Sequence, residues 1–305
     1  MSASRYFRRL LAVAGATTTL FLAAVVSPLI VARLLSGDFG ADQGDFLVCL
    51  FIPTSADWPS HLLSYSLAGL LSASMLAGVT SLVRQWYRTR RVVGMLLKLR
   101  GASSMSGLGS GSLVKLDTRI DFIRLDRPVA FCYGWLRPRI CLSTGAISGL
   151  SKREIEALLL HESHHVLCRD PLKSAVARVV ASAFFFLPVI AALQAQYLLA
   201  KEIEADEYAL HVQGSDRPLL GALYKLLLRQ AQPEASGLAV AGAAEAINQR
   251  LDYLLDKRVP AGPHLPAIFV SSFMITATST LLTLTTWAAA ASAFWHQAHS
   301  GLGGC

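Results

Sequence analysis

Two histidines and a glutamate in this sequence stand at the spacing that zinc hydrolases use. Residues 161–165 read His-Glu-Ser-His-His, so His161, Glu162 and His165 form the pattern HExxH. Because residues four apart lie on one face of a helix, both imidazoles can bind one Zn²⁺ ion. Glu162 would then lie beside the open coordination position, where its carboxylate can accept a proton from bound water. The motif predicts a metal-dependent hydrolase.

A catalytic zinc ion needs a third protein ligand, and Glu202 is the candidate. The segment Glu202-Ile-Glu-Ala-Asp206 begins 37 residues after His165. Glu202 and Asp206 would share one face of a helix, with Glu202 as the ligand and Asp206 accepting the N–H of a ligand imidazole. Glu204 would point elsewhere and is a weaker candidate, and His164 is interpreted as incidental, because it lies about 100° from His165 around the helix. Either pair alone is compatible with a solvated helix face, but the combination favours a metal site.

Caps and prolines mark the helices that must carry these residues. Ser151-Lys-Arg-Glu154 is a capping box that predicts a helix start, and Pro171 predicts the end of that helix. The HExxH motif therefore falls on a helix of about 151–169. Further helices are expected at about 199–213, around the Glu202 segment, and at about 218–230.

Two segments before these helices have the character of strands. Residues 113–126 and 128–144 are rich in aromatic and β-branched side chains, with a turn region around Gly134 and Pro138. A sheet of two to four strands is expected, and an exposed strand within 128–143 would align an extended substrate.

The composition is that of a membrane protein. Of the 305 residues, 53% are hydrophobic and 16% are charged, and the mean hydropathy is +0.46. Soluble domains carry roughly 25% charged residues, so a disordered chain is excluded and a simple soluble domain is not expected. A helix of about 20 apolar residues spans a bilayer, and four uncharged stretches are long enough. They are residues 10–32, 62–83, 179–200 and 259–305.

The positions of the positive charges predict the topology. The net charge is +8, yet no Lys or Arg occurs between Leu34 and Val83, whereas six occur in residues 84–100. Lys and Arg near span ends stay in the cytoplasm, so the N-terminus and residues 84–258 are expected inside and the 36–60 loop outside. The basic run is interpreted as this topology signal, because no nucleic-acid recognition motif accompanies it.

One uncharged stretch cannot be a simple span if the metal site is correct. A single crossing by residues 179–200 would place Glu202 outside and His161 inside, where they could not share a metal. A helix break at Pro188 would return the chain to the same side, so a re-entrant or buried hairpin is expected at about 172–200. The predicted organisation is two N-terminal spans (about 10–32 and 62–83) within 1–100, a Gly/Ser linker at 101–112, a cytoplasmic domain at 113–258, and a last span (about 266–294) within 259–305 that ends in a short exterior tail.

Three segments resemble the BlaR/MecR-type membrane metallopeptidases. They read PVAFCYGWLRPRICL (128–142), ALLLHESHHVLCRDPL (157–172) and FFFLPVIAALQAQYLLAKEIEADEYAL (184–210). Residues 246–256 are similar to the helix that precedes the last span in that family, so the resemblance covers about 120–256. It implies a gluzincin zinc endopeptidase. It implies His161, His165 and Glu202 as zinc ligands, Glu162 as the general base, and Asp206 as the aspartate behind a ligand histidine.

The sequence departs from this family at two points. Ser163-His164 makes the interior of the motif more polar than is usual, and no penicillin-binding sensor domain follows the last predicted span. The resemblance therefore implies the protease and does not imply antibiotic sensing. HtpX-like heat-shock proteases and CAAX prenyl proteases share HExxH…ExxxD with membrane spans and are the near alternative. A non-catalytic signalling or scaffold protein, zinc-bound or metal-free, is the alternative from another class, although it would have no use for Glu162.

Together these patterns predict an α-helical integral membrane protein with a cytoplasmic α+β gluzincin-like zinc metallopeptidase domain. The expected cofactor is Zn²⁺, and the expected partners are a protein or peptide substrate and the lipid bilayer, with no nucleic acid. The expected reaction is hydrolysis of peptide bonds in cytoplasmic or membrane-proximal proteins, with repressor cleavage or self-cleavage as a signalling role. The expected location is the cytoplasmic membrane, with the C-terminus outside.

Overall fold

The computed structural model is mostly helical, with one small sheet. It describes residues 2–36, 58–99 and 120–230, together with residues 250, 268, 272, 274, 278 and 292. In chain order the elements are α1 (Ala3–Ser36), α3 (Trp58–Leu99), β1 (Ile120–Ile123), β2 (Ala130–Tyr133), β3 (Arg139–Ser143), α4 (Thr144–Gly149), α5 (Lys152–Leu167), α6 (Asp170–Ala183), α7 (Pro188–Gln213) and α8 (Arg217–Gln230). The predicted linker at 101–112, most of the predicted span at 266–294 and the predicted tail lie outside the described residues.

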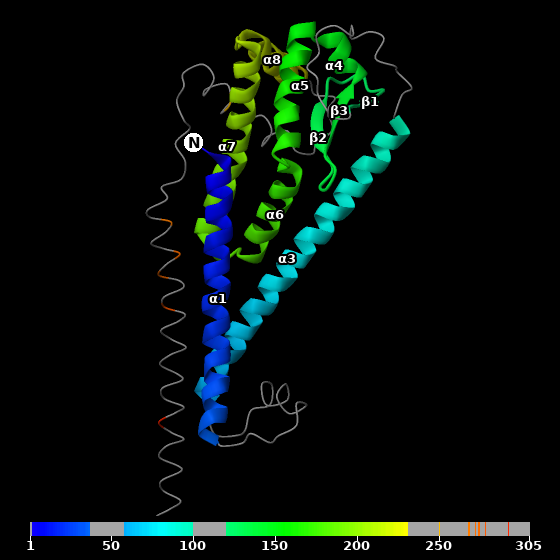
Figure 1. Cartoon of the computed structure of the whole chain (residues 1–305). Helices are drawn as coiled ribbons and strands as arrows, with labels where there is room; N and C mark the ends of the chain where they lie inside the picture. Colours follow the sequence, from blue (N-terminus) through cyan, green and yellow to red (C-terminus); the bar gives the residue numbers. More distant parts are fainter. Residues whose placement is uncertain are drawn as a thin grey trace, which may run out of the picture.

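The sheet lies towards one end of the molecule, and two long helices run away from it. Figure 1 shows the three strands with α4, α5 and α8 towards the end where α1 begins, while α1 and α3 extend towards the opposite end. Between them, α6 packs against α3, and α7 packs against both α1 and α5. The pair formed by α6 and α7 therefore connects the sheet end to the long helices.

The sheet has three strands in the order β1-β3-β2, within the predicted range. β1 pairs with β3 in parallel and β2 pairs with it antiparallel, with Cys132 opposite Ile140. The hairpin between β2 and β3 turns at Gly134, whose φ of 92° favours glycine. A Cβ at that position would come within 2.8 Å of the Arg137 carbonyl oxygen. Among the described residues β2 is an edge strand of the sheet, and it packs beside α5.

The start of α5 is fixed by the predicted capping box. Ser151 Oγ accepts from the Glu154 N–H at 3.4 Å, and Glu154 Oε2 accepts from the Ser151 N–H at 2.7 Å. Lys225 of α8 also donates to Glu154 Oε2 at 2.7 Å, which joins this helix start to α8. Burial alone would raise the pKa of Glu154, but Lys225 and the Ser151 hydrogen bonds lower it below its usual value. The helix predicted at about 151–169 is confirmed and ends at Leu167.

Two faces of α5 are buried against different neighbours. Leu159 shares a cluster with Ile140 of β3, and Leu160 shares another with Leu219 of α8 and Ala209 of α7. Burying a leucine side chain contributes about 1.5–3 kcal/mol, so these contacts strongly oppose any shift of the helix. The helix that carries HExxH is therefore held inside the core.

The chain reverses direction between α6 and α7. Arg169 adopts a left-handed conformation, with φ of 54°, just before Pro171 in the first turn of α6. Residues 184–187 then separate the two helices, and Pro188 occupies the start of α7, where its missing N–H costs no helical hydrogen bond. The helix predicted at 199–213 is only the second half of α7, because proline is well tolerated at the first helical position and the helix begins there. The reversal brings the end of α7 back beside α5.

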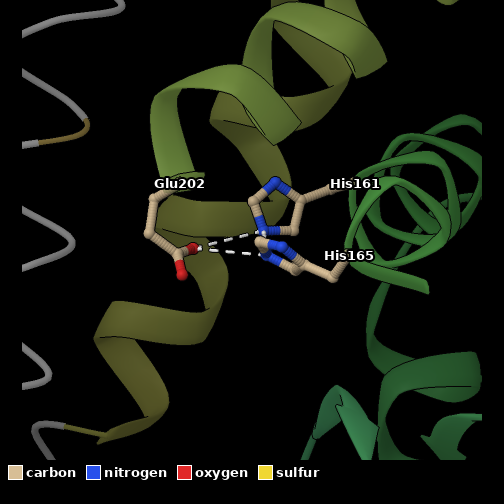
Figure 2. A group of neighbouring side chains, drawn as sticks. All are labelled: His161, His165 and Glu202. Atoms are coloured by element: carbon tan, nitrogen blue, oxygen red, sulfur yellow. Dashed lines mark hydrogen bonds and ion pairs between the residues drawn. The ribbon is translucent and has the colours of Figure 1, made fainter. Parts of the chain in front are cut away.

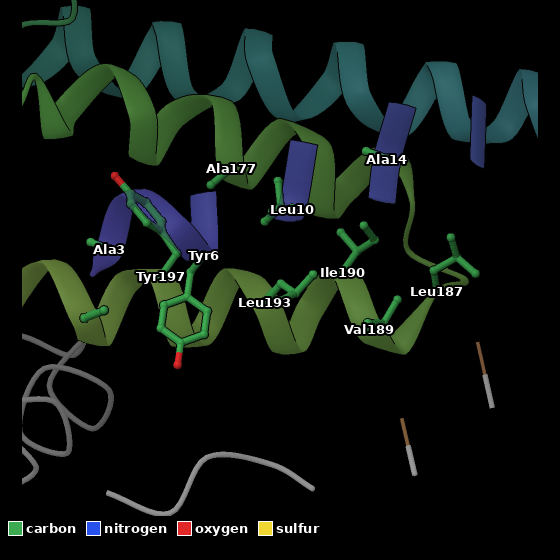
Figure 3. Close-up of a cluster of buried hydrophobic side chains, with 11 residues drawn as sticks. Ala3, Tyr6, Leu10, Ala14, Ala177, Leu187, Val189, Ile190, Leu193 and Tyr197 are labelled. Carbon is green, nitrogen blue, oxygen red and sulfur yellow. The ribbon is translucent and has the colours of Figure 1, made fainter. Parts of the chain in front are cut away.

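The first turns of α1 pack against this helix pair. Figure 3 shows Tyr6 and Leu10 of α1 beside α7, in a buried cluster that includes Ile190. At the start of α1 the N–H of Ala3 donates to Glu204 Oε1 at 2.7 Å. This N–H belongs to the first helical turn and has no partner within the helix. Glu204, the weaker candidate ligand in the sequence, therefore ties α1 to α7.

In the part of the chain that the structure describes, no helix combines the length and the apolar character needed to cross a bilayer. The spans predicted at about 10–32 and 62–83 fall within α1 and α3 and stay predictions.

Candidate metal centre

Three side chains from two helices bring their donor atoms together (Figure 2). Nε2 of His161 and Nε2 of His165 lie 3.1 Å apart, and Glu202 Oε2 lies 3.4 Å from the first and 3.6 Å from the second. A tetrahedral ion with bonds of about 2.0–2.1 Å holds its ligand atoms about 3.3 Å apart. The donor atoms of the three predicted ligands therefore have the spacing that a bound ion requires.

Helix α5 supplies the two histidines and α7 supplies the glutamate. His161 and His165 are four residues apart, and their rings meet edge to face. Both are buried, with 3% and 6% of their surface exposed, whereas the Glu202 side chain is 23% exposed. The group of donor atoms is thus closed on the histidine side and more open on the glutamate side.

Asp206 lies behind His161. Its Oδ1 is 2.8 Å from His161 Nδ1, and its side chain is completely buried. A proton held on Nδ1 fixes the ring tautomer, so that Nε2 presents a lone pair towards Glu202. Burial alone would raise the pKa of Asp206, but Arg250 and His161 hold it below its usual value.

Asp170 lies behind His165 as Asp206 lies behind His161, and it was not predicted from the sequence. His165 Nδ1 lies 2.7 Å from Asp170 Oδ2, and both groups are buried. In the sequence Asp170 stands directly before Pro171, which indicated only the end of a helix. The available signal was an acidic residue five positions after the motif, in the first turn of the next helix. The left-handed Arg169 allows the chain to turn there and point this carboxylate back at the ring.

Arg250 lies behind Asp206 and is the second residue of the site that was not predicted from the sequence. It is buried, and its Nε and Nη2 donate to the two oxygens of Asp206 at 2.8 and 2.5 Å. Its Nη1 also lies 3.6 Å from Glu202 Oε2. A guanidinium that binds both oxygens of a carboxylate fixes the orientation of that carboxylate as well as its charge. The signal was weak, since Arg250 is 44 residues from Asp206 and belongs to no local motif.

Electrostatic effects keep Glu202 ionised and His165 protonated when no metal is bound. Burial alone would raise the pKa of Glu202, but Lys201 and the two histidines hold it well below its usual value. Burial alone would lower the pKa of His165, but hydrogen bonds to Asp170 and Glu202 raise it to about 9. A bound cation would displace this proton and use the negative charge of Glu202.

Glu162 is buried on α5, next in sequence to the ligand His161. Only 7% of its surface is exposed. Burial raises the pKa of Cys132 on β2 to about 12, and the negative charge of Glu162 adds to that effect. Helix α5 packs against β2, so the charge of Glu162 acts on a neighbouring strand, and Cys132 stays a neutral thiol.

His164 takes no part in the donor group of Figure 2. It belongs to a second set of potential metal-binding atoms, with His165 and Asp170, that lie within 4.8 Å of one another. In that set His165 and Asp170 are already hydrogen-bonded, and His164 Nε2 contacts Cys168 Sγ at 3.6 Å. In this second set Asp170 therefore orients His165, which is a member of the first donor group.

A family profile for the BlaR1 peptidase M56 matches residues 98–254, slightly more than half of the chain. The chain belongs to the BlaR1 peptidase M56 family. The matched segment contains all the residues of the site, including the two that the sequence analysis missed. The resemblance seen in the sequence is confirmed, and membership of a metallopeptidase family implies a metal.

A curated relative is the protease HtpX homolog of Gemmatimonas aurantiaca. The two proteins are 27% identical over 164 residues, which cover 41% of this chain and 58% of the relative. The chain thus matches a little over half the length of that protease. This similarity is compatible with the HtpX-like alternative as well as with the M56 family.

Loss of the Arg250 guanidinium should leave a buried charge uncompensated. We expect Arg250→Met to lower the free energy of unfolding by about 3–5 kcal/mol, the usual cost of breaking a buried ion pair from one side. Denaturant titration of the full chain measures this loss. Adding Asp206→Asn should restore part of it, because the buried charge is then removed. Strictly additive effects of the two substitutions would show that the pair is not coupled.

Zinc affinity should rise as the pH rises towards about 9. Below that value His165 of the metal-free protein carries a proton that zinc must displace. The affinity should therefore fall by up to about tenfold for each pH unit below it. Competition with a chelator between about pH 6.5 and 8.5 measures the slope. Asp170→Asn should flatten it, because the carboxylate that raises this pKa is lost, and an equal slope in both proteins would contradict the assignment.

Proposed function

We propose that this chain is a zinc-dependent endopeptidase. The observation that carries the proposal is the separation of 3.1–3.6 Å among the donor atoms of His161, His165 and Glu202. Two imidazoles and one carboxylate form a donor set typical of catalytic zinc, with the fourth position left for water. Membership of the M56 family supports the same reaction class.

Each residue of the site has a separate task in this proposal. Bound zinc supplies a Lewis acid that lowers the pKa of a water molecule. Glu162 accepts the proton of that water and passes it to the leaving amine. Asp206 and Asp170 keep protons on the Nδ1 atoms of the two histidines, so that both Nε2 atoms stay available as ligands. A non-catalytic zinc protein would need the ligands but not Glu162.

The substrate is proposed to be a protein segment in extended conformation, bound along β2. This strand pairs with β3 on one side only among the described residues, and it packs beside the histidine helix. The negative charge of Glu162 helps to raise the pKa of Cys132 in this strand, which supports a position of the strand within reach of the proton acceptor. A peptide that adds a strand to this edge would pass the proposed zinc site, with backbone hydrogen bonds holding it in register.

We propose further that the chain is anchored in the cytoplasmic membrane with this site on the cytoplasmic side. The distribution of Lys and Arg supports this, since the run at 84–100 follows a stretch without any. The structure adds exposed apolar side chains just before that run on α3, which lipid would cover. They are Met75, Leu76, Val79, Leu82 and Val83.

Two biological roles fit the same chemistry. The M56 match favours signalling by cleavage of a repressor or of the chain itself. The similarity to an HtpX homolog favours quality control of membrane proteins. Identifying the fragments that accumulate in cells with the active protein separates the two roles, because the first yields one defined product and the second yields many.

Replacing the proposed base should stop cleavage without releasing the metal. We expect Glu162→Gln to reduce the rate of peptide hydrolysis by about 10²–10⁴-fold, because the amide cannot accept the proton. Zinc content should equal that of the native chain, since Glu162 is not a ligand. Cleavage of an unfolded protein substrate and metal analysis on the same sample test both points. Native cleavage rates in the variant would refute the catalytic role of Glu162.

Labelling of single cysteines tests the proposed topology. Ser215→Cys, after α7, should react only with reagents that enter the cytoplasm, whereas Ser300→Cys should react from outside. Labelling of the parent chain in parallel corrects for its own thiols. Reaction of position 215 from outside would overturn both the topology and the cytoplasmic location of the site.

A further inference from the structure

The two carboxylate oxygens of Glu202 have different partners. Oε2 lies 3.4 Å from His161 Nε2 and 3.6 Å from His165 Nε2. Oε1 forms an ion pair with Lys201 Nζ at 3.0 Å. One oxygen thus faces the proposed zinc position, and the other is held by an ammonium group.

Lys201 lies beside Glu202 at the border of the site. Its side chain is only 17% exposed, although lysine is among the residues most often found at the surface. Burial raises the pKa of Cys132 on β2, and the positive charge of Lys201 acts against that rise. Neighbouring side chains on a helix point about 100° apart, so the lysine must bend back to reach Glu202.

We infer that Lys201 is a positioning residue that holds Glu202 Oε1 away from the metal, so that Oε2 alone acts as ligand. This inference rests on the proposed zinc site. A carboxylate that bound zinc through both oxygens would occupy the position needed for water. The ion pair with Lys201 stabilises Oε1 where it is and thereby keeps that position available.

Arg250 is not placed to hold Glu202 Oε1 in the way that Lys201 does. Its Nε and Nη2 are already engaged with both oxygens of Asp206, and its Nη1 approaches Oε2 of Glu202 at 3.6 Å. Among the described residues, Lys201 is the cation that contacts Oε1. The two basic residues therefore act on different carboxylate oxygens.

Substitution of Lys201 in the full-length chain tests the inference. We expect Lys201→Met to weaken zinc binding by about 10–100-fold in competition with a chelator, the usual range for the loss of a group that orients a ligand. Cobalt(II) replaces zinc as a spectroscopic probe, and its visible absorption is intense with four ligands and weaker with five. The spectrum of Lys201→Met should shift towards five-coordinate, because both oxygens of Glu202 can then bind.

Two further variants make the result specific. Lys201→Arg keeps a cation at the same place and should restore most of the affinity and the native spectrum. Lys152→Met removes an exposed lysine at the start of α5 and should change neither. Recovery with arginine separates positioning of Glu202 from a general loss of folding, which arginine would not be expected to repair selectively.

The outcomes separate this inference from the proposed function. If the native chain binds zinc and cleaves peptides while Lys201→Met keeps its affinity and spectrum, Lys201 has no positioning role and the zinc site stands. If the native chain binds no zinc, the proposed function fails and this inference fails with it. If Lys201→Met and Lys201→Arg are equally weakened, the positive charge is not what positions Glu202, and the inference is overturned.

Discussion

The whole arrangement depends on bringing a carboxylate of α7 within 3.6 Å of two imidazoles of α5. Glu202 follows His165 by 37 residues, so the chain must leave α5, turn back and bring Glu202 beside the two histidines. The left-handed Arg169 and the break at 184–187 provide the two changes of direction. Packing of α7 against α1 and α5 then fixes the position of Glu202. Packing of the hydrophobic core thus brings the residues of the site together.

Buried charges behind the histidines make this geometry rigid. An isolated carboxylate with no exposed surface would be strongly unfavourable, and Asp206 is stable only because His161 and Arg250 compensate it. The same bonds that satisfy Asp206 also fix the tautomer of His161, and Asp170 repeats the arrangement at His165. The same contacts therefore stabilise the fold and orient the two histidines for metal binding. A protein that weakened these ion pairs to gain flexibility would also lose the orientation of its ligands.

Local sequence patterns predicted much of the fold and of the site. Residues whose role depends on long-range contacts could not be predicted. The capping box at Ser151 and the i, i+4 spacings located the helices and the five residues gathered at the site, because these signals lie within one or two turns. Asp170 was missed because its role depends on the left-handed Arg169, which turns the chain between α5 and α6, and Arg250 because its partner is 44 residues away. The first half of α7 was missed because Pro188 marks both a break and a helix start. Propensity alone cannot say which meaning applies, whereas packing against α1 can.

The site is asymmetric, and this asymmetry indicates how a substrate would approach. On the inner side, Asp206 and His161 are almost fully buried by the packed helices. On the outer side, Glu202 retains 23% of its side-chain exposure and Lys201 retains 17%. Strand β2 packs against α5, and the charges of Glu162 and Lys201 both act on the pKa of its Cys132. A peptide bound along β2, as proposed, would approach from the exposed side, whereas Asp206 and His161 stay buried behind the ligands, so that binding can vary with substrate while the support of the ligands remains constant.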